Sequence, residues 1–214
     1  MAKAVHSLTI RAQETMIRTP EALIPYLLAV AALCAGLLWH LGDMSGGLGR
    51  VITVGEAQIG GPYVLIDQNG VERDSRDFTG KWQLLYFGYT HCPDVCPLTL
   101  EMMGDVMSKL GTDARRVVPV FITVDPQRDT PKVMKAYVAA FGKRFVGLTG
   151  DAKSIANVER EYRVYARRHD LPGGDYAMDH SSVIYLMGPD GKFVTDYNDV
   201  ADPAKIAADI KSRF

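Results

Sequence analysis

The sequence predicts an α/β fold in which a central mixed sheet has helices on both faces, preceded by one N-terminal transmembrane helix. Apolar runs typical of strands alternate with helical stretches from residue 61 to the C-terminus. Two of these runs, residues 83–89 and 117–124, are continuous, as in strands buried on both faces. Residues 22–39 carry no charged side chain, and this length is close to the roughly 20 residues that cross a bilayer.

The elements of the folded part are expected in a fixed order. They are strands at 63–66 and 83–89, a helix at 98–110, a strand at 117–124, helices at 133–141 and 153–162, a hairpin of strands at 182–187 and 192–197, and a last helix. Asn-Gly at 69–70 predicts a hairpin turn after the first strand. Thr130-Pro131 and Asp202-Pro203 are typical helix starts. This order, with antiparallel strands at the edges, predicts a thioredoxin-like sandwich.

The uncharged stretch is expected to be an uncleaved membrane anchor. Lys3, Arg11 and Arg18 precede it, whereas Arg50 is the one basic residue among residues 42–61. The positive-inside rule then places the N-terminus in the cytoplasm and the rest of the chain outside. A cleaved signal peptide and a lipoprotein anchor at Cys34 are the alternatives, and neither has a fitting cleavage site. The predicted organisation is a cytoplasmic tail (1–21), a transmembrane anchor (22–41), a flexible linker (42–60) and a thioredoxin-like domain (61–214).

Composition excludes two classes of protein. The 214 residues carry a formal charge of −1, with basic residues scattered along the chain, so nothing supports nucleic-acid binding. Three cysteines are too few for a disulfide-stapled scaffold, so the core must come from the 47% of hydrophobic residues.

A cysteine pair directly follows the strand at 83–89. Cys92 and Cys96 are separated by three residues, where a redox dithiol usually has two. Residues four apart on a helical turn lie about 5–6 Å from each other, so both sulfurs can bind one metal ion. They can also close a disulfide if the backbone bends, as Pro93 and Pro97 favour. A position at a helix N-terminus stabilises the thiolate, the form that binds metals and attacks as a nucleophile.

His180 is the candidate third ligand among five histidines. It stands just before the strand at 182–187, in the loop that faces the thiols in thioredoxin-like folds. His91 adjoins Cys92 and is expected to point away, and His169 lies in a basic, loop-like stretch where we expect it to be solvated. The residues alone leave two interpretations of His180, a metal ligand or a hydrogen-bonded histidine at a surface turn, and they favour the second.

Four motifs in register resemble the Sco/SenC family, membrane-anchored proteins of cytochrome oxidase assembly. The motifs are FGYTHCPDVCP at 87–97, ITVDPQRDTP at 122–131, GLTG at 147–150 and DHSS at 179–182. The likeness extends from about residue 60 to the C-terminus. One departure is Gln127, where many members have glutamate, and it affects only a local turn.

The resemblance implies that Cys92, Cys96 and His180 bind one copper ion. Two soft thiolates and an imidazole select Cu(I) or Zn over Mg or Ca. The expected function is a copper metallochaperone, not an enzyme, that delivers copper to the CuA centre of cytochrome c oxidase subunit II. The alternative is a thiol–disulfide oxidoreductase that uses Cys92 and Cys96 as a redox pair on the same client.

The expected partners follow from that function. They are subunit II, another copper chaperone as donor, a thioredoxin-like reductant, and the membrane through the N-terminal helix. The expected location is a bacterial inner (plasma) membrane with the folded domain in the periplasm. Glu14, Glu21 and the short leader favour this over a mitochondrial inner membrane.

The other residues near the motifs are expected to be structural. Met102, Met103 and Met107 have the helical spacing of core residues. Asp125, Arg128 and Asp129 are expected to brace a loop near the site, and Asp179 to orient its neighbours, with weak metal ligation as a further option.

Overall fold

The computed structural model describes residues 20–45 and 58–214, and within the first range the side chains of residues 24–40. Helix α1 (Pro20–Ser45) belongs to one unit of the chain, and all the strands belong to a second. Among the helices so described, none is long and apolar enough to span a bilayer. The predicted tail (1–21), apart from its last two residues, and residues 46–57 of the predicted linker lie outside the described residues.

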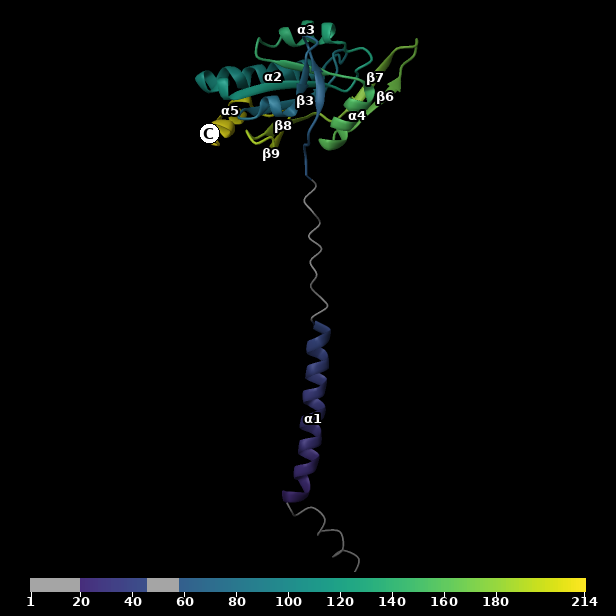
Figure 1. Ribbon diagram of the computed structural model, residues 1–214, viewed down its shortest axis with the longest axis vertical. Helices are drawn as coiled ribbons and strands as arrows, with labels where there is room; N and C mark the ends of the chain where they lie inside the picture. Colours follow the sequence, from purple (N-terminus) through teal and green to yellow (C-terminus); the bar gives the residue numbers. More distant parts are fainter. Residues whose placement is uncertain (1–19, 46–57) are drawn as a thin grey trace, which may run out of the picture. The chain divides into compact units, whose positions relative to one another are not determined.

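The second unit is built on a seven-stranded mixed sheet (Figure 1). Its order is β2 (Glu72–Asp74), β1 (Val64–Asp67), β5 (Val146–Thr149), β4 (Val117–Thr123), β3 (Trp82–Gly88), β8 (Val183–Met187) and β9 (Phe193–Asn198). Strands β3, β4 and β5 are parallel, and the strands on either side of these three are antiparallel to their neighbours. The predicted α/β, thioredoxin-like arrangement with a mixed sheet is confirmed.

Strand β3 forms the centre of the core. Successive side chains of a strand point to opposite faces of the sheet. The four consecutive residues Leu84, Leu85, Tyr86 and Phe87 are all completely buried, so both faces of the sheet are covered here. This is what the continuous apolar run at 83–89 predicts.

The helices and short helical turns connect these strands. They are a 3₁₀ turn at Ser75–Phe78, α2 (Val95–Leu110), a 3₁₀ turn at Gly111–Arg116, α3 (Pro131–Ala139), α4 (Ala152–Glu161) and α5 (Pro203–Lys211). The Thr130 side chain caps α3 by accepting from the Val133 amide, and Asp202 caps α5 by accepting from the Ala204 amide. Both predicted starts are confirmed, whereas α2 begins at Val95, three residues before the predicted start.

One prediction about local structure is wrong. The stretch around His169, expected to be loop-like, forms strand β6 (Ala166–Asp170), which pairs with β7 (Tyr176–His180) in a separate two-stranded sheet. Gly173 and Gly174 both have positive φ and make the turn between these strands. His180 is therefore the last residue of a strand, which fixes its direction more firmly than a loop would.

Candidate metal centre

The cysteine pair spans the junction between β3 and α2. Cys96 lies in the first turn of α2 and is completely buried, whereas Cys92 precedes the helix and is half-buried. Both thiols are free, and the Cys96 amide donates to the Cys92 sulfur at 3.4 Å. Gly88 makes room for this arrangement, because a Cβ there would lie 2.8 Å from Cys96 Sγ.

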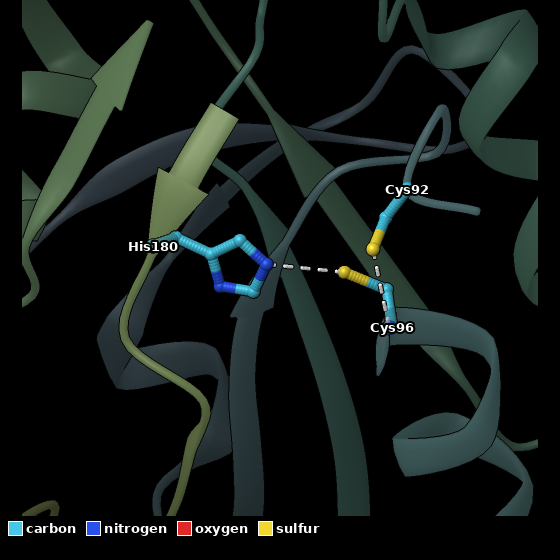
Figure 2. A group of neighbouring side chains, drawn as sticks. All are labelled: Cys92, Cys96 and His180. Carbon is cyan, nitrogen blue, oxygen red and sulfur yellow. Dashed lines mark hydrogen bonds between the residues drawn. The ribbon is translucent and has the colours of Figure 1, made fainter. Parts of the chain in front are cut away.

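His180 reaches the pair from the hairpin of β6 and β7. Its Nε2 lies 3.3 Å from Cys96 Sγ, and Figure 2 shows the ring aimed at that sulfur. Its Nδ1 lies 3.1 Å from the Ser181 carbonyl, which can only accept a hydrogen bond. The proton therefore belongs on Nδ1, and Nε2 presents its lone pair to the sulfurs.

Two tyrosine rings hold the imidazole in place. The rings of Tyr86 and Tyr89 pack edge-on against His180, with centroid separations of 6.1 and 5.8 Å. The Tyr86 hydroxyl also lies 3.9 Å from Cys96 Sγ, and burial raises the pKa of Tyr86 well above its usual value. Sequence reasoning missed both tyrosines. The available signal was that Tyr86 shares a face of β3 with Gly88, the residue that makes space for Cys96.

The pKa values of the two thiols are shifted in opposite directions. A hydrogen bond from the Cys96 thiol holds the pKa of Cys92 far below its usual value, and the Cys96 and Asp94 amides act in the same direction against partial burial. The same hydrogen bond to Cys92, together with burial, raises the pKa of Cys96. The half-buried sulfur of Cys92 is thus the thiolate, and the completely buried sulfur of Cys96 keeps the proton.

Together the three residues form a compact set of soft donor atoms. One potential ligand atom each from Cys92, Cys96 and His180 lies within 4.8 Å of the other two. Two sulfurs and one imidazole nitrogen suit Cu(I) or Zn far better than Mg or Ca. Three protein donors also leave room for a further ligand from outside.

A buried carboxylate braces the cysteine loop. Asp129 is completely buried and accepts from the Thr90 amide at 3.0 Å, the Thr90 hydroxyl at 2.5 Å and the Thr123 hydroxyl at 2.6 Å. Thr90 lies two residues before Cys92. Asp129 therefore ties the loop that carries Cys92 to the end of β4.

A second network attaches the hairpin. Arg128 donates to Asp125 at 2.5 Å and to the Tyr176 carbonyl at 2.9 Å, and its guanidinium lies 3.6 Å from the centre of the Tyr176 ring. The Tyr176 hydroxyl donates to Asp125 at 2.9 Å. This cluster of Asp125, Arg128 and Tyr176 connects the strand that carries His180 to the β4–α3 loop, so the expected bracing roles of Asp125, Arg128 and Asp129 are confirmed.

The remaining candidates lie away from the three donor atoms. His91 is half-exposed and contacts the Thr90 hydroxyl, as expected from its position beside Cys92. His169 lies 3.3 Å from Asp179, and both side chains are about half-exposed. Met102, Met103 and Met107 are buried in the core, as predicted.

Comparison with known proteins gives a consistent set of matches. The family model described as SCO1/SenC matches residues 53–214. The mitochondrial SCO2 homolog of Danio rerio is 46% identical over 157 residues, covering 72% of this chain and 56% of the relative. The chain spans about half the length of the curated relatives it matches.

Solved structures match the same region. Bradyrhizobium japonicum ScoI with copper bound is 47% identical, with a TM-score of 0.69, covering 73% of this chain and 99% of that one. BsSco, described as a Sco family member in which a disulfide switch was identified, is 29% identical, with a TM-score of 0.59, covering 72% and 92%. It is described as belonging to a family of cytochrome c oxidase assembly proteins.

Proposed function

This chain belongs to the SCO1/SenC family, and we propose that it is a copper chaperone that binds one copper ion through Cys92, Cys96 and His180. Its client is the CuA centre of cytochrome c oxidase subunit II. The observation that carries the proposal is the convergence of two sulfurs and Nε2 within 4.8 Å. Copper-bound relatives and a relative assigned to oxidase assembly support the choice of cargo and client.

The arrangement suits transfer of the ion more than its storage. Cys92 is half-buried, whereas Cys96 is completely buried, so an incoming ligand from the client meets the ion on the Cys92 side. A three-donor site lets the new ligand bind before an old one leaves. Thiolate ligands must be deprotonated, so loading displaces the proton held by Cys96.

The proposed location is the bacterial inner membrane, with the copper-binding domain (61–214) in the periplasm. Support comes from the uncharged stretch 22–39, the basic residues before it, and the exposed apolar side chains on α1. Those side chains include Leu27, Leu28, Leu33, Leu37 and Leu38. An anchor at 22–41 and a linker at 42–60 would keep the domain near a membrane-bound client and raise its effective concentration.

A second candidate function is thiol–disulfide exchange on the same client. The low pKa of Cys92 and its partial exposure favour it, because an accessible thiolate attacks disulfides. The disulfide switch described for BsSco supports it as well. A copper donor and a thioredoxin-like reductant are the further partners proposed, since an oxidised pair must be reduced before it binds copper.

Complementation of a deletion strain separates the two functions. We expect oxidase activity to be restored by the wild-type gene and by His169→Ala, a matched control on the same hairpin, but not by His180→Ala. Added copper should partly restore activity in the deletion strain. Full restoration by His180→Ala, or rescue by a small thiol reductant with no response to copper, would favour the oxidoreductase instead.

A further inference from the structure

Tyr86 occupies an unusual position for a tyrosine in a buried strand. It lies near the end of β3, is completely buried, and its ring stacks on Phe121 with centroids 6.3 Å apart. Its hydroxyl lies 3.9 Å from Cys96 Sγ, and its ring edge meets His180. One side chain thus touches two of the three proposed ligands.

The local packing keeps Tyr86 in this position. Gly88 is two residues farther along the same strand, and a Cβ on it would lie 2.8 Å from Cys96 Sγ and 3.1 Å from the Tyr86 ring. The missing side chain leaves the space in which the hydroxyl and the sulfur meet. A buried phenol usually has a hydrogen-bond partner, and a thiolate sulfur is an acceptor.

The hydrogen-bond donors to the two sulfurs differ in kind. Cys92 accepts from the main-chain amide of Cys96, which no substitution at position 96 removes other than proline. Cys96 accepts from the Tyr86 hydroxyl, which belongs to a side chain. This side-chain donor to the buried sulfur can be removed by deleting a single oxygen atom, whereas a main-chain donor cannot.

We propose that Tyr86 is a positioning residue that tunes the copper site through an O–H···S hydrogen bond to Cys96, and that this bond favours Cu(I) over Cu(II). The inference rests on the proposed copper-binding function. A hydrogen bond to a thiolate withdraws electron density from sulfur, and hydrogen bonding around a cysteine ligand is known to tune the reduction potential of copper sites. Cu(II) depends more than Cu(I) on an electron-rich thiolate, so the bond raises the potential of the bound ion.

The test is Tyr86→Phe in the full-length chain, which removes only the hydroxyl. Tyr63→Phe is the matched control, because Tyr63 is also buried and its hydroxyl has no hydrogen-bond partner among the described residues. We expect Tyr86→Phe to lower the Cu(I)-to-Cu(II) affinity ratio about ten-fold, the size of effect of one hydrogen bond to a charged group. A ten-fold fall in this affinity ratio corresponds to a fall of about 59 mV in the one-electron potential of the bound copper.

A spectroscopic measurement distinguishes tuning of the copper site by Tyr86 from a purely structural role of this residue. The thiolate-to-Cu(II) charge-transfer band should shift to lower energy in Tyr86→Phe and stay in place in Tyr63→Phe.

If Tyr86→Phe does not fold, 3-fluorotyrosine at position 86 provides a stronger donor, and both the band and the potential should move in the opposite direction. Unchanged potential and spectra in a folded Tyr86→Phe, or in the fluorinated protein, would overturn the inference while leaving copper binding intact. A wild-type chain that binds no copper would overturn the proposed function together with this inference.

Discussion

The two halves of the candidate metal centre are built in different ways. Cys92 and Cys96 follow the most deeply buried strand, and their loop is held by Asp129, a buried carboxylate with three hydrogen bonds. His180 comes from the β6–β7 hairpin, where strand β6 is almost entirely exposed and forms a separate two-stranded sheet with β7 (Figure 1). The sulfurs are placed by the core, and the imidazole is placed by a small number of side-chain contacts.

This difference means that the site can lose its third donor without losing its fold. The hairpin is attached near its tip by Arg128 and Tyr176, and at its base His180 is held between two tyrosine rings. Segments with few buried apolar contacts open at low free-energy cost compared with core strands. The thiol pair should therefore persist under conditions in which His180 moves away.

The largest effect is expected from removing a proposed ligand on either side. Cys92→Ser and Cys96→Ser should weaken Cu(I) binding by more than roughly 100-fold, since loss of an outer-shell partner alone costs about 10–100-fold. His180→Ala should weaken Cu(II) binding as strongly but Cu(I) binding less, because two thiolates can hold Cu(I). Anaerobic titration with competing chelators measures both. Wild-type affinity for both ions in His180→Ala would contradict the three-ligand site.

A smaller effect is expected from loosening the hairpin. Arg128→Ala removes the contacts to Asp125 and Tyr176, and should weaken copper binding about ten-fold and speed hydrogen exchange in β6 and β7. The alkylation rate of Cys92 should not change, because the cysteine loop is held separately. The control is Arg167→Ala, an exposed residue on the same hairpin. If Arg128→Ala speeds Cys92 alkylation as much as it speeds hydrogen exchange in β6 and β7, the two halves of the site are not independent.

The smallest effect concerns a carboxylate beside the hairpin. Glu159 of α4 lines a cavity of about 180 Å³ with Tyr176 and Met178, and burial raises its pKa from 4.5 to about 7. Because this pKa is higher in the folded state than in the unfolded state, the folded chain holds a proton on Glu159 more tightly. The stability that depends on this protonation is complete below about pH 4.5 and is lost as the pH rises through 7.

Glu159→Gln should therefore raise the unfolding free energy by about 2 kcal/mol at pH 8, discounting for partial exposure, and change little at pH 4.5. Denaturant unfolding at the two pH values measures this. Glu101→Gln on the exposed side of α2 is the control. A Glu159→Gln effect that is equal at both pH values would rule out a pKa-based cause.

Sequence reasoning was strongest where local signals and motifs agree. The continuous apolar runs identified β3 and β4, and cap residues such as Thr130 identified helix starts. The hairpin was missed because its strand β6, Ala-Arg-Arg-His-Asp, is exposed and polar, so burial leaves no alternating pattern in it. Tyr86 was missed because a tyrosine in a buried strand looks like any core residue until the register places it against Cys96.

X-ray absorption at the copper edge tests the central claim most directly, because it counts the atoms that bind the ion. The reduced, copper-loaded full-length chain is compared with His180→Ala under the same conditions. We expect two sulfur scatterers and one imidazole in the wild-type chain, and loss of the imidazole signal in the variant. A sulfur-only shell in the wild type, or an unchanged imidazole signal in His180→Ala, would contradict a site made by Cys92, Cys96 and His180.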